Sequence, residues 1–216
     1  MKKIALIGAS GFVGSALLHE ALERGHSVTA IVRHPEKITW ESPNLHVKQG
    51  DILSEESVPE LIAGADVVIS AYNPGWNNPN IAVDTAKGYK SIINGVKSAG
   101  ISRLLIVGGA GSLLVSPGKR VMDTAAIPES FKPGIKSLAD VLYTLQEEEK
   151  ELDWAFFSPA GSIAPGERTG KFRLGKDDLV ADRDGKSNIS VEDYAVAMLD
   201  EVEIPQHHRE RFTIGY

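Results

Sequence analysis

The chain has 216 residues, of which 42% are hydrophobic and 24% are charged, and its formal net charge is −6. This composition is typical of a globular protein with one sizeable core, and its interspersed charges argue against a nucleic-acid partner. No cysteine is present, which excludes disulfides and thiolate chemistry. Its apolar runs are shorter than a membrane span or a signal peptide requires, so we expect a cytoplasmic monomer or homodimer with no membrane partner.

Short apolar runs alternate with amphipathic stretches along the chain. Runs typical of strands buried on both faces lie at residues 4–7, 28–32, 45–48, 67–70, 104–107 and 154–157. Helical patterns lie between them, at residues 12–24, 55–63, 81–99 and 137–152. Because strict alternation of strands and helices requires parallel pairing with right-handed crossovers, the sequence predicts an α/β Rossmann fold, a doubly wound parallel sheet with helices on both faces.

The last sixty residues differ in composition from the rest of the chain. Gly, Pro and charged residues dominate residues 159–184, where alternating runs predict the two strands of a β-ribbon, at residues 171–174 and 179–181. A helix capped by Ser190 and a final strand are expected at residues 191–202 and 211–214. We therefore expect a single domain over residues 1–216, in which residues 159–216 form a small substrate-side lobe.

A glycine-rich turn joins the first strand to the first helix. Gly8 permits a tight exit from the strand, Gly11 lets the backbone approach a pyrophosphate, and Gly14 lets the helix pack close to the strand. The N–H groups at the helix start then face the phosphates. Because Ala9 replaces a glycine, the spacing is G-x-x-G-x-x-G, and a flavodoxin-like βα turn is the alternative to the dinucleotide site that we predict. Its expected contacts are Gly8, Ser10, Gly11, Phe12, Val13 and Gly14.

The end of the second predicted strand bears on the choice of cofactor. NAD-binding proteins place a carboxylate there to bind the ribose 2′-OH, but this chain has Arg33, followed by His34 and Lys37. A guanidinium at this point would pair with a 2′-phosphate, unless it is only a solvated surface group. We predict NADP(H) as the favoured cofactor, with NAD(H) possible. Asp51 and Ile52 are further expected contacts, although Asp51 is equally suited to capping a turn.

Several motifs spread over nearly the whole chain carry a family resemblance. They are Gly8-Ala-Ser-Gly-Phe-Val-Gly14, Val32-Arg33, Gly50-Asp51, Gly108-Gly-Ala-Gly-Ser112, Asp153-Trp154, Phe157-Ser-Pro-Ala160 and Ile189-Ser-Val-Glu-Asp-Tyr-Ala195. With them the chain resembles the atypical short-chain dehydrogenase/reductase superfamily, in its NADH-flavin reductase-like or biliverdin-reductase-B-like branch, a neighbour of the NmrA-like proteins. The resemblance implies a nicotinamide cofactor and hydride transfer to a flavin or another planar acceptor. It also implies that the nicotinamide lies near Ala71 and Tyr72, near residues Gly109 to Ser112, and near Pro159 and Ala160.

The Tyr-x-x-x-Lys dyad that most of this superfamily uses is absent. Four residues after Tyr72, Tyr89, Tyr143 and Tyr194 stand Trp76, Ile93, Glu147 and Met198, and Tyr216 ends the sequence. Since the dyad moves a proton on a substrate oxygen, its absence disfavours a sugar-nucleotide epimerase or dehydratase. Hydride transfer to a flavin needs no such group, because the cofactor carries the reaction. The sequence thus favours an NAD(P)H-dependent oxidoreductase, with a non-catalytic NmrA-like dinucleotide redox sensor as the alternative.

Two side chains are candidates for a part in catalysis. Ser112 could donate a hydrogen bond to a substrate carbonyl or flavin edge, or it could simply cap a loop. Tyr72, together with Trp76, could form one aromatic wall of a site for a planar ligand, or both rings could pack their own loop onto the domain. No metal site is expected, since the six histidines lack zinc-type spacing.

Overall fold

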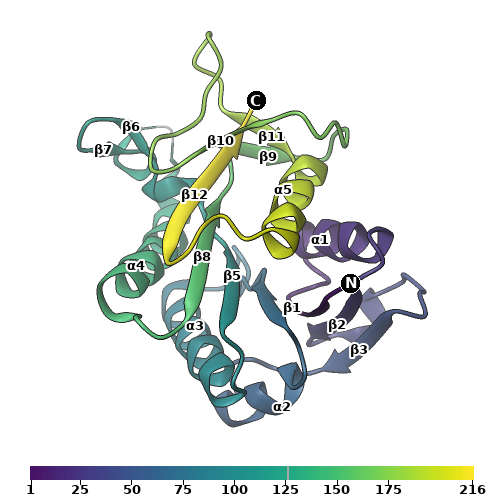
Figure 1. Cartoon of the computed structure of the whole chain (residues 1–216). Helices are drawn as coiled ribbons and strands as arrows, with labels where there is room; N and C mark the ends of the chain where they lie inside the picture. Colours follow the sequence, from purple (N-terminus) through teal and green to yellow (C-terminus); the bar gives the residue numbers. More distant parts are fainter. Residues whose placement is uncertain (126) are drawn as a thin grey trace.

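A computed structural model describes residues 1–125 and 127–216, and within them eight strands form one sheet in the order β10-β12-β8-β5-β4-β1-β2-β3 (Figure 1). All neighbours pair in parallel except β10 and β12, which are antiparallel. The strands are β1 (Lys3–Ile7), β2 (Ser27–Val32), β3 (Leu45–Gln49), β4 (Val67–Ser70), β5 (Arg103–Val107), β8 (Asp153–Ser158), β10 (Arg173–Gly175) and β12 (Glu210–Gly215).

Helices cover both faces of this sheet (Figure 1). One face carries α1 (Phe12–Glu23) and α5 (Val191–Glu203), and the other carries α2 (Val58–Ile62), α3 (Ile81–Ser98) and α4 (Lys132–Glu148). Each face has its own buried apolar cluster, one containing Leu17 and Tyr194 and the other Tyr89 and Leu142. The predicted Rossmann fold is therefore confirmed. Among the described residues, no helix is both long and apolar enough to cross a membrane.

The order of the strands reverses at the centre of the sheet. From β1 the chain builds outward through β2 and β3 on one side, then returns to add β4, β5 and β8 on the other. The connections that leave β1 and β4 therefore run to opposite faces, and they open a crevice at the carboxyl ends of these two strands. This is the place in a doubly wound sheet where ligands bind.

Two predicted helices differ from the observed ones at their boundaries. The predicted helix at residues 137–152 is α4, which begins five residues earlier because Pro133 lies in its first turn, where the missing N–H breaks no helical hydrogen bond. The predicted helix at residues 55–63 is divided into a 3₁₀ turn, Glu55–Ser57, and the short α2. The earlier start of α4 brings Ile135 to the carboxyl edge of the sheet, where it lines the cavity described below.

The β-ribbon prediction is wrong in its pairing. β10 forms near the first predicted strand, but it pairs with β12, and residues 179–181 form no strand. Val180 instead packs on the glycines of the β10–β12 ladder, because a Cβ on Gly215 would lie 2.9 Å from Val180 Cβ. The alternation in the sequence therefore reflects packing onto a strand pair. The structure adds two short sheets, β6 (Leu114–Ser116) with β7 (Lys119–Arg120) and β9 (Ser162–Ala164) with β11 (Asn188–Ser190).

A buried carboxylate ties the C-terminal segments together. Ser190 caps α5 as predicted, since its hydroxyl oxygen accepts a hydrogen bond from the Asp193 backbone N–H. The fully buried Asp193 carboxylate accepts hydrogen bonds from Thr169, Gly170 and the Tyr216 hydroxyl. Burial opposes ionisation of Asp193, but these donors outweigh it and hold its pKa below the ordinary value. The network anchors the segment that follows β9 beside α5.

Candidate cofactor and acceptor site

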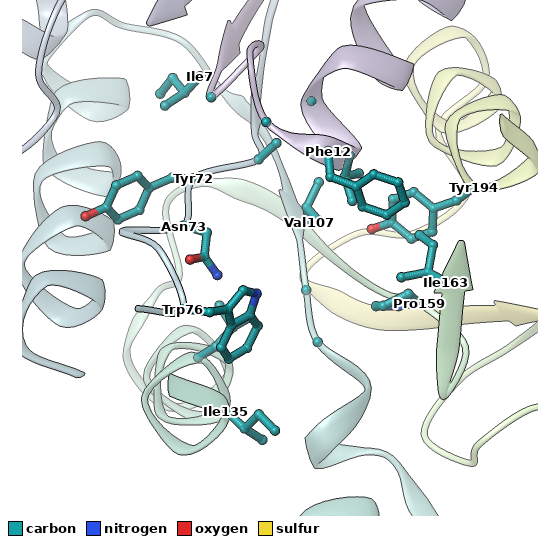
Figure 2. A pocket seen from close by; sticks show the side chains of 18 of the residues that line it. Ile7, Phe12, Tyr72, Asn73, Trp76, Val107, Ile135, Pro159, Ile163 and Tyr194 are labelled. Atoms are coloured by element: carbon teal, nitrogen blue, oxygen red, sulfur yellow. The ribbon is translucent and has the colours of Figure 1, made fainter. Parts of the chain in front are cut away.

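A cavity of about 630 Å³ lies at the carboxyl ends of the central strands (Figure 2). Its volume is within the range of small-molecule and cofactor sites. The cavity brings together every residue that the sequence singled out for the cofactor or for catalysis: Gly8, Ser10, Gly11, Phe12, Val13, Gly14, Arg33, Asp51, Ile52, Ala71, Tyr72, Gly109, Ser112 and Pro159. The individual contacts of these residues with a cofactor stay a prediction.

The glycine turn has the close backbone packing that its sequence requires. Gly8 has a φ of +81°, and a Cβ there would lie 2.6 Å from the carbonyl oxygen of Ala71. A Cβ on Gly14 would lie only 2.0 Å from the carbonyl oxygen of Gly8. A Cβ on Gly11, in contrast, would meet only that same oxygen, at 3.3 Å. Gly8 and Gly14 are therefore required by the protein itself, whereas Gly11 leaves space on the side of the cavity.

The start of α1 is suited to bind an anion. Gly11 is its N-cap and provides no side chain to cap the helix. The first intrahelical hydrogen bond runs from the Ser15 N–H to the Gly11 carbonyl. Within the described part of the chain, the N–H groups of Phe12, Val13 and Gly14 have no acceptor. Unpaired N–H groups and the positive end of a helix dipole are the donor set that holds a diphosphate, so the residues present fit a dinucleotide.

One end of the cavity, beyond β2 and β3, carries positive charge. Arg33 and Lys37 are exposed there, and neither forms an ion pair with any residue that the structure describes. His34 pairs with Glu36 at 3.1 Å. Asp51 Oδ1 accepts a hydrogen bond from the Leu53 N–H at 3.0 Å, which is the turn-capping role considered for it. This end therefore offers two unpaired cations to an anionic group.

The two tyrosines that line the cavity use their hydroxyls to hold the fold. Tyr72 donates to the carbonyl oxygen of Asp84 in α3, and Tyr194 donates to the carbonyl oxygen of Phe157 in β8. Burial, assisted by the charge of Asp84, raises the pKa of Tyr72 to about 12, and burial raises that of Tyr194 well above its ordinary value. Both hydroxyls are thus protonated at neutral pH, and neither has the lowered pKa of a catalytic tyrosine.

Ser112 is buried and held by a residue that the sequence did not suggest. Its hydroxyl oxygen accepts a hydrogen bond from Arg211 Nη1 at 2.9 Å, and Arg211 also binds Asp177 at 2.6 Å. Arg211 lies in β12, and nothing in the sequence linked this final strand to the turn after β5. Since Arg211 fills the acceptor side of the hydroxyl, the Ser112 hydrogen is left to donate elsewhere.

The other end of the cavity has a flat apolar wall. Trp76 lies edge-on to Phe131, with ring centroids 5.4 Å apart, and a Cβ on Gly134 would lie 3.1 Å from the indole ring. Figure 2 shows Trp76 and Ile135 on this side of the cavity, whereas the Tyr72 hydroxyl points toward the helices. Of the two suggested aromatic residues, Trp76 therefore supplies the exposed ring, and Ile135 was missed because the helix was expected to start at residue 137.

Comparison with known families identifies the kind of protein. A family model described as NAD(P)H-binding matches residues 8–202, which include the glycine turn and most of the sheet. The chain belongs to this NAD(P)H-binding family. Together with its similar structures, this match confirms the resemblance to the atypical short-chain dehydrogenase/reductases.

Several related proteins match over nearly their whole length. A crystal structure from Bacteroides thetaiotaomicron, provisionally described as an epimerase, is 58% identical, with a TM-score of 0.94 over 100% of this chain and 97% of that one. One from Streptococcus pneumoniae, provisionally described as an NADH-flavin reductase, is 34% identical, with a TM-score of 0.84 over 100% and 99%. The uncharacterised protein YwnB of Bacillus subtilis is 40% identical over 215 residues, which are 98% of this chain and 97% of YwnB.

The geometry of the glycine turn predicts that Gly14→Ala affects stability, whereas Gly11→Ala affects dinucleotide binding. Gly14→Ala places a methyl group 2.0 Å from the Gly8 carbonyl oxygen, and we expect it to lower the free energy of unfolding by about 1–3 kcal/mol. Gly11→Ala is the matched control for folding, because its Cβ would make a single close contact, 3.3 Å from the Gly8 carbonyl oxygen, which a small shift relieves. It should leave stability nearly unchanged and weaken dinucleotide binding. Urea denaturation and calorimetric titration with NADP⁺ measure both; equal stability of the two variants would contradict the packing argument.

Proposed function

We propose that this protein is an NAD(P)H-dependent reductase, with NADPH preferred, that transfers hydride directly to a flavin or a similar planar acceptor. The observation that carries the proposal is the single cavity that runs from the glycine turn to the wall at Trp76. It has a cationic end suited to a 2′-phosphate and an apolar end suited to a flat ring. The flavin reductase name of the Streptococcus relative supports the same function.

The chain's own groups have positioning roles in this reaction. The N–H groups that open α1 hold the diphosphate, and Arg33 with Lys37 binds the 2′-phosphate. When bound, a reduced nicotinamide would supply a hydride (two electrons and one proton) to the acceptor ring, and the single further proton that completes flavin reduction would come from water. Ala71, Gly109 and Pro159 border the ring at the carboxyl ends of β4, β5 and β8. From residues 159–216, the predicted substrate-side lobe, Pro159 and Ile163 line the cavity and would exclude water from the second ring.

An epimerase, as the Bacteroides relative is provisionally called, is less well supported. Epimerisation through a ketone requires a group that removes and returns a proton at an oxygen. The two tyrosines on the cavity donate to backbone carbonyls, and their pKa values are raised. A reductase that delivers hydride between two stacked rings needs position and the exclusion of water more than an acid or base.

Turnover is the direct test of the proposal. The purified protein is mixed with NADPH and riboflavin without oxygen, and the loss of NADPH and of oxidised flavin is followed by absorbance. We expect equimolar loss of both, faster with NADPH than with NADH. If NADP⁺ binds tightly but no flavin or quinone is reduced, the protein is a dinucleotide sensor and the reductase proposal is rejected.

Arg33 is expected to select the phosphorylated cofactor. Arg33→Asp should weaken NADPH binding by about 1–3 kcal/mol, because a charge-assisted contact is lost and a repulsive charge is added. NADH binding should change far less. Arg183→Asp is the matched control, since Arg183 is an exposed arginine outside the cavity. Calorimetry with both cofactors measures the effect; equal weakening for NADPH and NADH would show that Arg33 does not bind the 2′-phosphate.

Tyr72 is expected to be structural. Because burial raises its pKa to about 12, its hydroxyl stays protonated from pH 6 to pH 9, and kcat should show no tyrosine ionisation in that range. Tyr72→Phe should therefore lose far less than the roughly 10²–10⁴-fold typical of an acid/base residue. A pH profile of both proteins checks this. A basic limb near neutral pH that disappears in Tyr72→Phe would assign Tyr72 a catalytic role.

A further inference from the structure

We propose that the acceptor end of the cavity selects an uncharged planar ring that carries carbonyl groups, and that it disfavours the same ring when an anionic group is attached. This selectivity deepens the proposed function and rests on it for the hydride donor. It follows from the distribution of charge along the cavity, the wall at Trp76 and one neutral hydrogen-bond donor.

The charged side chains that line the cavity gather at one end. Arg33, His34, Lys37 and Asp51 all follow β2 or β3. Among the described residues, the lining that follows β5 and β8 contains no charged side chain; it includes Val107, Val121, Ile135, Pro159 and Ile163. The sheet order separates these two groups of loops by the width of β1 and β4. A cofactor phosphate is therefore attracted at one end, and a second anion finds no partner at the other.

Four cations near the acceptor end already have counter-ions. Each has a carboxylate partner within 3 Å: Arg120 with Asp123, Lys132 with Glu129, Lys136 with Asp140, and Arg211 with Asp177. None of these four cations lines the cavity. An acceptor phosphate or sulfonate that entered this end would therefore lose part of its hydration without gaining a counter-ion from the lining, which is costly. Arg33 and Lys37, in contrast, have no carboxylate partner in the part of the chain that the structure describes.

The wall itself suits an aromatic ring. Trp76 is 49% exposed, yet its position is fixed between Phe131 and the Cβ-free surface of Gly134. An exposed indole that is held in place offers a large contact area at a small cost in side-chain entropy. Because Ile135 continues the same surface, this end of the cavity favours a flat apolar ligand.

Asn73 supplies a neutral donor beside the wall. Its Oδ1 accepts a hydrogen bond from the Gly75 N–H at 2.7 Å, which orients the amide and leaves its NH₂ group to donate. Figure 2 shows Asn73 and Trp76 reaching into the cavity from the same loop. An amide NH₂ matches a ring carbonyl, such as those of a flavin or a quinone. It carries no charge with which to balance a phosphate.

Riboflavin and FMN test the selectivity, since they share one ring and differ by a phosphate. We expect kcat/KM with NADPH to be higher for riboflavin than for FMN by about threefold or more, and Kd in the presence of NADP⁺, measured by flavin fluorescence, to differ in the same direction. Equal values or a preference for FMN would overturn the inference. Binding of riboflavin without turnover would reject the reductase proposal and leave the selectivity standing.

A lysine at position 73, in the acceptor end of the cavity, should reduce the preference for riboflavin over FMN. Asn73→Lys should lower the ratio of kcat/KM for riboflavin to kcat/KM for FMN, because the lysine gives the FMN phosphate a counter-ion. Asn77→Lys adds the same charge on the same loop but outside the cavity lining, so it should leave the ratio unchanged. Asn73→Asp is the near-isosteric second variant and should raise the ratio. Equal shifts in Asn73→Lys and Asn77→Lys, or no shift in either Asn73 variant, would show that Asn73 does not face the acceptor.

Discussion

The contact between Gly14 and the Gly8 carbonyl sets the geometry of the whole site. It lets α1 approach β1 so closely that a single methyl group would not fit. The start of the helix is thereby fixed at the carboxyl end of the central strand, where its free N–H groups face the crevice between β1 and β4. A dinucleotide whose diphosphate is bound there would extend along the strand ends in both directions, so this close approach of two backbone segments sets the direction of the proposed binding site.

Charge is arranged along that direction. The loops after β2 and β3 bring unpaired cations to one end, and the segments after β5 and β8 bring apolar side chains and neutralised ion pairs to the other. NADPH bound as proposed would place its 2′-phosphate where the protein is positive and its neutral nicotinamide ring where the protein is apolar. Electrostatics as well as shape would therefore favour this orientation of the proposed cofactor.

Much of this could be predicted from the sequence, because the signals are local. Strands buried on both faces produce short apolar runs, and β1, β2, β4, β5 and β8 all lie where those runs predicted them. The glycine spacing and Arg33 likewise depend only on neighbouring residues. The pairing of the strands is harder to predict from the sequence. The run at residues 179–181 does not mark a strand, because its Val180 packs onto glycines of the β10–β12 pair.

The acceptor end could not be predicted in the same way. Phe131 and Gly134 meet Trp76, and Ile135 joins the cavity lining, only after α4 has packed beside the loop that follows β4. Arg211 reaches Ser112 across 99 positions of sequence. No fixed separation in the sequence predicts these contacts, because each depends on where two separate elements pack.

The two tyrosines that line the cavity connect the fold to the kind of chemistry it supports. A tyrosine that serves as an acid or base needs its hydroxyl free and its pKa lowered, but Tyr72 and Tyr194 each bind a main-chain carbonyl and have raised pKa values. In this chain, tyrosines at the cavity stabilise the strand ends that carry the site. With neither tyrosine available as an acid or base, the site suits a reaction whose rate depends on how closely two rings are held.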